Sequence, residues 1–190
     1  MDELEKGQHS YSGARQEFWF NQLLGGDISS DVYLQIDGIR GESQDSAHKD
    51  WIECSSVHWG IMQPRSACAS SNGGHTAERC ELDDIMFDKL ADLASPILMQ
   101  TCAAGKTIPK AKFEFMRADG NGTPIKYFEI ELENVLIGQV IPSIEAGSLL
   151  AENVCLKFSK VKWKYSQQKI GGGSGGQTLG GWDLAQNKIA

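Results

Sequence analysis

Thiols and imidazoles supply the first candidate for chemistry in this sequence. Cys54, Cys68, His75 and Cys80 lie within a short stretch, and thiolate and imidazole are the ligands that tetrahedral zinc takes. Structural zinc sites usually contain a close pair such as C-x-x-C, and no such pair occurs in the sequence. These cysteines are better explained as small side chains that pack in the interior as weakly hydrophobic residues than as zinc ligands. The sequence therefore predicts no metal site and no cofactor.

Candidates for acid, base or nucleophilic catalysis are equally few. Nucleophilic catalysis would need a serine or cysteine within reach of an oriented base, and the sequence indicates no such arrangement. His58 lies beside Trp59 in an expected strand, where a lone histidine is typically structural, and His48, in a charged loop, is interpreted as a contact residue. Glu129 and Glu131 lie in register along one expected strand, which favours a solvated face over an acid/base pair. We therefore predict no catalytic residues and no enzymatic activity.

Apolar and polar residues alternate through much of the chain. The candidate side chains discussed above are therefore expected to lie mainly on strands. Val32, Leu34 and Ile36 share one face of an expected strand, as do Phe113 and Phe115. A period of two is typical of strands with one buried face. The sequence therefore predicts a β-rich protein.

An expected hairpin contains the clearest alternation. Its turn lies at residues 119–124, where two glycines and a proline occur. The strand that follows directs apolar side chains inward and acidic side chains outward: Phe128, Ile130 and Leu132 against Glu129, Glu131 and Glu133.

The strand expected from Val154 to Tyr165 changes its apolar parity near Ser159, which predicts a bulge there. Its second half exposes a basic row that can lie opposite the acidic row of the hairpin: Lys160, Lys162 and Lys164. Two solvated faces with weak pairing are an equal alternative, because exposed pairs contribute under about 1 kcal/mol each.

One short helix is expected between the strands. Ser95 suits the N-cap, Pro96 the first helical position, and Gly105 the left-handed residue that ends a helix. A helix of this length is not stable alone, so it must pack on the sheet.

Two segments remain. Residues 171–181 are glycine-rich and are predicted to be a flexible segment rather than a phosphate-binding loop, since the lysine of such a loop is missing. Residues 1–30 contain apolar side chains ahead of Gly25 and Gly26, which fits one or two amphipathic helical turns with a glycine stop.

Composition limits the class of protein. The chain has 190 residues, enough for one domain with a core, and a formal charge of −7, which disfavours nucleic acid as a partner. No apolar run long enough to span a membrane occurs, and the acidic start lacks the apolar core of a cleaved signal. Five cysteines at irregular spacing are typical of reduced thiols. We predict synthesis in the cytoplasm and no membrane insertion.

A dense pattern opens the domain. Between Leu34 and Lys49 the chain contains the elements of the pattern LxIDGIxGES…D…HK: Leu34, Ile36, Asp37, Gly38, Ile39, Gly41, Glu42, Ser43, Asp45, His48 and Lys49. Further matching pieces follow in order: Trp59-Gly60, residues 94–98, residues 102–106, residues 158–161 and residues 181–184. This pattern resembles that of the haemolysin-coregulated protein (Hcp) family, the tube proteins of the bacterial type VI secretion system. The resemblance covers residues 31–190.

The resemblance implies a fold and a structural function. The expected fold is mainly β, an antiparallel β-barrel of two packed sheets with one short α-helix, similar to phage tail-tube proteins. Copies are expected to form hexameric rings that stack into an expelled tube, carry small effector proteins in the lumen, and meet the spike and sheath proteins. Export without a cleaved signal peptide is implied, with roles in virulence and bacterial competition.

The loop from Gly38 to Asp50 is the candidate contact surface between subunits or rings. It has few apolar side chains, so a solvated loop is the alternative to a stacking contact. Its candidate contact residues are Arg40, Glu42, Ser43, Asp45, His48 and Lys49.

Two alternative functions stay open. The first is a carrier or adaptor variant, in which the N-terminal segment 1–30 is a fused cargo or docking element. The second is a free-standing enzyme on a β-barrel, which requires a convergent polar pocket that the sequence does not indicate.

Overall fold

The computed structural model describes residues 30–64, 79–119, 122–168 and 174–190. The elements, in chain order, are β1 (Ser30–Ile36), β2 (Ile52–Cys54), β3 (Ser56–His58), β4 (Ile61–Met62), β5 (Glu81–Leu82), β6 (Ile85–Leu90), α2 (Ser95–Ala104), β7 (Thr107–Ala118), β8 (Pro124–Ser143), β9 (Ala151–Lys157), β10 (Lys160–Gln168), β11 (Ser174–Asp183) and β12 (Lys188–Ile189). No helix among these described residues is long and apolar enough to cross a membrane.

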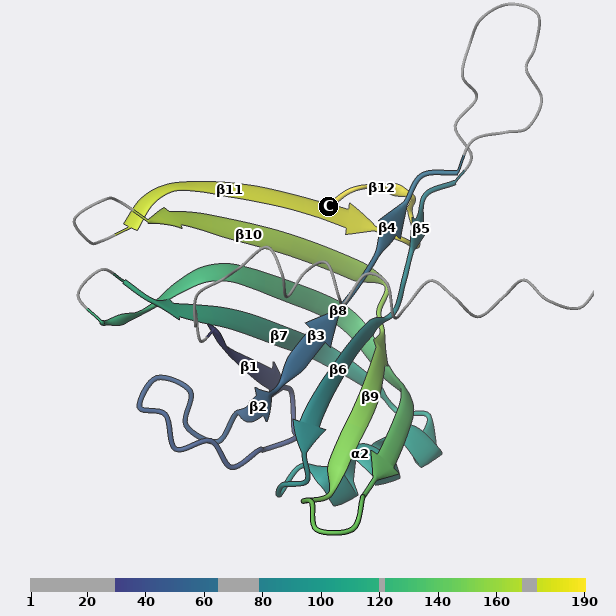
Figure 1. Ribbon diagram of the computed structural model, residues 1–190. Coiled ribbons are helices and arrows are strands. Elements are labelled where there is room, and N and C mark those ends of the chain that lie inside the picture. Colours follow the sequence, from purple (N-terminus) through teal and green to yellow (C-terminus); the bar gives the residue numbers. More distant parts are fainter. Residues whose placement is uncertain (1–29, 65–78, 120–121, 169–173) are drawn as a thin grey trace, which may run out of the picture.

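Ten strands form one antiparallel sheet in the order β12-β11-β10-β8-β7-β1-β2, and β3, β6 and β9 join it through β8 (Figure 1). The mainly antiparallel β class with one short helix is confirmed for the described residues. The two predicted sheets are continuous with each other through the long strand β8. Among the described residues no continuous ladder closes this sheet into a barrel, since β2 pairs there only with β1 and β3 only with β6.

The long strand β8 bends the sheet. Its first half pairs with β10 and its second half with β9. The change falls at Asn134, which has a φ of 53° and donates from its side-chain amide to the Ser159 hydroxyl. A bulge was predicted at Ser159, but the chain instead breaks there into two strands, β9 and β10. These strands pair with different parts of β8, which accounts for the change in which alternate residues are apolar.

The core forms where the inward faces of the strands meet. Phe87 of β6 packs edge-on against Phe113 of β7, with ring centroids 5.8 Å apart. Leu34, Ile130 and Leu132 are fully buried beside them, as the alternation predicted.

Helix α2 covers one end of the sheet (Figure 1). Its C-terminus is as predicted, with Gly105 left-handed at φ 60° and its N–H bonded to the Cys102 carbonyl. The predicted N-cap is wrong by one residue, because Ala94 occupies it and Ser95 is already helical. The Ser95 hydroxyl instead donates to Glu152, while Lys89 Nζ donates to Ser95 and to Glu152 Oε2 at 3.0 Å each. This buried cluster ties β6, β9 and the helix start together.

Part of the glycine-rich segment forms a strand. Residues 174–183 form β11, which pairs with β10, and a sheet ladder needs only backbone groups. Residues 171–173 lie outside the described residues, as does the helical turn predicted in residues 1–29.

Candidate functional site

The loop that joins β1 to β2 is folded by its own backbone. Gly38 takes φ 80° and lets the chain leave β1. Gly41 N donates to Asp50 O at 2.9 Å, and Ser43 N donates to Trp51 O at 3.1 Å, so the two arms of the loop run side by side. A Cβ at Gly41 would lie 2.3 Å from Trp51 O, which explains why glycine is needed at this close approach.

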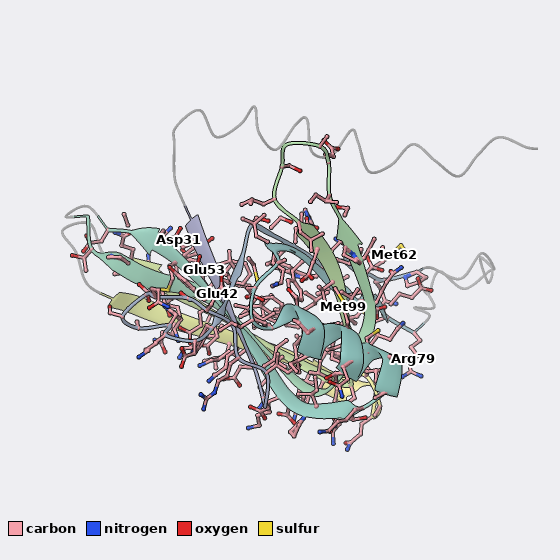
Figure 2. All side chains as sticks on the ribbon, turned by 90° about the horizontal axis from the view of Figure 1, so that it is seen from below. Asp31, Glu42, Glu53, Met62, Arg79 and Met99 are labelled. Atoms are coloured by element: carbon pink, nitrogen blue, oxygen red, sulfur yellow. The ribbon has the colours of Figure 1, made fainter. Side chains whose placement is uncertain are left out.

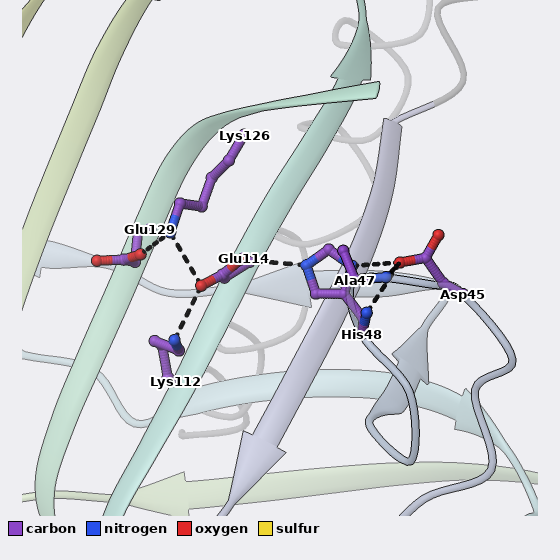
Figure 3. A network of polar contacts seen from close by, with 7 residues as sticks. All are labelled: Asp45, Ala47, His48, Lys112, Glu114, Lys126 and Glu129. Atoms are coloured by element: carbon purple, nitrogen blue, oxygen red, sulfur yellow. Dashed lines mark hydrogen bonds and ion pairs between the residues drawn. The ribbon is translucent and has the colours of Figure 1, made fainter. Parts of the chain in front are cut away.

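His48 fixes the loop to the sheet, and it is only 3% exposed. Its Nδ1 lies 2.7 Å from Asp45 Oδ1 and its Nε2 lies 3.1 Å from Glu114 Oε2 of β7 (Figure 3). Only the charged imidazolium can donate at both nitrogens. The ring also stacks on Tyr33, with centroids 4.2 Å apart, and meets the Trp51 ring edge-on. The loop is therefore clamped by a buried imidazole between two carboxylates.

Glu114 is the centre of this polar network. Its Oε1 accepts from Lys112 and Lys126, each at 2.9 Å, and Lys126 also bonds Glu129 (Figure 3). Burial alone would raise the pKa of Glu114, but the bonds from Lys112, Lys126 and His48 outweigh it and lower the pKa from 4.5 to about 2. The bond from His48 likewise lowers the pKa of Asp45. Both carboxylates are thus held in the charged form.

The predicted contact residues separate into two groups. Ser43 and His48 are buried and hold the loop, with Asp45 half-buried between them. Arg40, Glu42 and Lys49 are exposed and available to a partner. Although the loop has few apolar side chains, the buried Ile39, the hydrogen bonds of its backbone and His48 hold it against the sheet.

Sequence reasoning missed the sheet side of the clamp. The solvated face predicted for Glu129 is wrong, because Glu129 is buried, and Glu114 of the neighbouring strand is buried beside it. Lys126 and the half-buried Lys112 cover them together with the loop. Glu131 is exposed as predicted. The basic and acidic rows do face each other, with Lys160 opposite Glu133, Lys162 opposite Glu131 and Lys164 opposite Glu129.

The cysteines form no metal site in the part of the chain that the structure describes. No group of three or more His, Cys, Asp or Glu side chains there is arranged so that it could hold a metal ion, and Cys68 and His75 lie outside the described residues. Burial raises the pKa of the Cys54 thiol, and burial together with Asp84 raises the pKa of Cys155 to about 11. Protonated thiols are poor ligands and nucleophiles. His58 is exposed at the end of β3.

A polar groove of about 200 Å³ crosses β1, β7 and β8 on the outer face of the sheet. It is lined by charged residues of both signs, among them Asp37, Lys110, Lys112 and Glu133. Its lysines and glutamates lie on neighbouring strands, with Lys110 opposite Glu133. The groove therefore belongs to the charged outer surface of the sheet.

The open, mainly antiparallel sheet with one short helix and the long clamped loop fit a structural protein of the tail-tube class. The family described as "Type VI secretion system effector, Hcp" matches residues 33–165. The chain belongs to the Hcp family, whose members assemble as hexameric rings, and it is a structural component of the type VI secretion tube.

Individual relatives agree with this assignment. Protein hcp1 of Pseudomonas aeruginosa is 34% identical over 162 residues, which are 84% of this chain and 98% of that protein. The crystal structure of Hcp1 from Salmonella typhimurium has a TM-score of 0.69 at 33% identity and covers 86% of this chain and 100% of its own. A structure described as a type six secretion system protein has a TM-score of 0.79 at 25% identity, over 85% of this chain and 100% of that one.

Proposed function

We propose that six copies of this chain close a ring through the edge of β11, and that rings stack through the exposed side of the loop from Gly38 to Asp50. The observation that carries ring closure is the β11 edge. From Ser174 to Gly180, β11 pairs with β10 on one side and with no other strand of the described residues, because β12 meets only Trp182 and Asp183. An unpaired edge is a template for another strand.

The composition of β11 suits that role. Gly175, Gly176, Gly180 and Gly181 leave few side chains along the strand, so the backbone of a second copy can approach closely. Pairing edges around a closed ring removes the exposed edge from every copy. Light scattering after gel filtration is expected to give a hexamer, and a monodisperse monomer at high concentration would contradict ring closure.

We assign the contact between stacked rings to the exposed charged side chains of the loop. Arg40, Glu42 and Lys49 are exposed, while the clamp beneath them fixes their positions. Mixed charges at such a contact determine register more than affinity. Figure 2 shows Glu42 well away from Met62 and Arg79, so changes in the loop do not alter the surface around those two residues.

The test reverses the loop charges in one variant, Arg40→Glu with Glu42→Lys and Lys49→Glu. Rings are expected to persist, while tubes in electron micrographs and secretion into the medium decrease. Lys106→Glu is the matched control, because it changes the net charge by the same amount at an exposed position outside the loop. If the triple variant forms tubes as readily as the wild type, the loop is not part of the stacking contact.

The wider role follows from family membership. The ring lumen would carry small effector proteins, the tube would meet spike and sheath proteins, and the chain would leave the cell through the secretion machine without enzymatic activity of its own. Family membership and the short candidate set for catalysis support this proposal. Co-purification of effectors with the ring, abolished when the ring is broken, tests it.

A further inference from the structure

The tip of the charged loop, defined here as residues 44–49, is held against the sheet by one side chain. From Gly41 onward, the backbone bonds of the loop join its two arms to each other and to Trp51. The side chains of the tip are exposed except for half-buried Asp45 and buried His48. In the part of the chain that the structure describes, the polar contact between the tip and a strand is that of His48 Nε2 with Glu114 Oε2 of β7. Loss of this contact would free the tip and leave every strand intact.

Both ring nitrogens of His48 face a carboxylate oxygen (Figure 3). Nδ1 lies 2.7 Å from Asp45 Oδ1, which also accepts two backbone N–H groups, and Nε2 lies 3.1 Å from Glu114 Oε2. A neutral imidazole carries one N–H, so its other nitrogen would direct a lone pair at a carboxylate. Neither carboxylate supplies the missing proton, because the bond from His48 lowers the pKa of Asp45 and the pKa of Glu114 is about 2. The contacts on both sides therefore require the imidazolium.

The charges around His48 balance only when its ring is protonated. Three carboxylates and two lysine ammonium groups form one connected cluster with the ring: Asp45, Glu114, Glu129, Lys112 and Lys126. The imidazolium supplies the third positive charge. Removing its proton leaves a carboxylate charge unpaired beside a residue that is only 3% exposed, where water stabilises a charge poorly. The neutral ring is therefore expected to leave its place between the two carboxylates.

The neighbouring tyrosine and lysine keep their protons through the neutral range. Tyr33 of β1 stacks on the ring, and burial raises its pKa, with a further rise from three nearby carboxylates: Asp45, Asp31 and Glu53. Burial would lower the pKa of Lys126, but its bonds to Glu129 and Glu114 raise it instead. Histidine, by contrast, ordinarily changes charge between about pH 5 and 8. Within this cluster, His48 is therefore the group that a change of pH near neutrality acts on.

We propose that His48 is a pH-dependent switch for the loop: the charged ring holds the tip on β7, and loss of its proton releases the tip. A ring that gains two carboxylate partners on folding stabilises the docked tip below its titration range and not above it. This inference rests on the proposed stacking contact, because release of the tip also frees the exposed Lys49. Tubes are therefore expected to form readily in mildly acidic solution and poorly in alkaline solution.

The experiment follows the tip in the full-length protein from about pH 6 to pH 9, below the concentration at which tubes form. Hydrogen exchange of residues 44–49, divided by the intrinsic exchange rate at each pH, gives the protection of the tip, and nuclear magnetic resonance of the histidine ring nitrogens gives their protonation. Glu114→Gln is the decisive variant, because glutamine keeps an acceptor for the lysines and offers an N–H to the neutral ring. His48→Phe keeps an aromatic ring and has no proton to lose. His58→Gln is the control, since His58 is exposed at the end of β3.

In the wild type and the control, the protection of the tip is expected to fall about tenfold for each further pH unit once the ring is neutral, because one proton is released. Glu114→Gln is expected to keep nearly constant protection, and His48→Phe to lose it at every pH. Protection in the wild type that stays constant to about pH 9 would overturn the inference. So would full protection in His48→Phe, since packing alone would then hold the tip. If His48→Phe does not fold, the comparison of wild type with Glu114→Gln decides the case, and an equal fall in both contradicts the switch.

Failure of this inference differs from failure of the stacking contact. Tubes are counted in electron micrographs over the same pH series at a higher protein concentration. If the tip is released with rising pH while tubes form equally well throughout, the switch is supported and the loop is not the stacking contact. If the charge-reversed loop abolishes tubes while the protection of the wild-type tip does not depend on pH, the stacking contact is supported and the switch is wrong.

Discussion

Replacing Glu114 by Gln should remove a pH-dependent part of the stability of the protein. The carboxylate has a pKa of about 2 instead of 4.5, so its stabilising effect is complete above about pH 4.5 and disappears as the pH falls through 2. A shift of this size corresponds to roughly 3 kcal/mol at neutral pH. The partners Lys112 and Lys126 are 31% and 33% exposed, so solvent screening reduces the expected value to about 2 kcal/mol.

The measurement is the free energy of unfolding in urea from pH 7 to pH 2. The Glu114→Gln variant is expected to be less stable than wild type at pH 7, and the difference should shrink below pH 4.5. Glu131→Gln is the matched control, because Glu131 is an exposed glutamate of the neighbouring strand, and it should differ from wild type by under about 0.5 kcal/mol. A difference for Glu114→Gln that is constant down to pH 2.5 would refute the assignment of the effect to a charged carboxylate.

Three further variants test other parts of the structure. Lys89→Met strands the buried charge of Glu152 and should cost about 3 to 5 kcal/mol in urea unfolding, whereas the double variant Lys89→Met with Glu152→Leu should recover most of that loss; equal losses would contradict the pairing. Gly41→Ala places a methyl group against the backbone of Trp51 and should speed proteolysis of the loop and reduce tubes while rings remain. Deleting residues 2–28 removes no described strand, so the ring and its melting temperature should change little. If the truncated protein does not fold, these residues belong to the domain and its boundary lies before residue 30.

Several elements could be predicted from the sequence because their signals are local. The alternation in the hairpin strands predicted Leu34, Phe113 and Ile130 as core residues, and all three are buried. The hairpin that pairs β7 with β8 and the helix end at Gly105 depend on glycine and proline, whose backbone preferences act within a few residues. The register of the charged rows followed from a period of two once both strands were recognised.

The interior polar clusters could not be predicted in this way. Alternation divides a strand into two faces but does not say what covers the second one, and Glu114 is buried because His48 reaches it from 66 positions away. Lys89 and Glu152 are similarly separated by 63 positions. Such pairings depend on the topology of the sheet. Patterns within a short stretch of sequence contain no information about that topology.

The sequence by itself determined the class of fold, the family and the location of the charged loop, because periodicity and the opening pattern between Leu34 and Lys49 are properties of contiguous residues. Only the tertiary structure decided which loop residues are exposed and which are buried, and that part of the glycine-rich segment is a strand paired with β10. The physical reason is that burial and edge pairing are set by contacts between distant segments. The glycines of β11 form a strand because β10 provides their hydrogen-bond partners. His48 holds the loop because it lies between the carboxylates of Asp45 and Glu114.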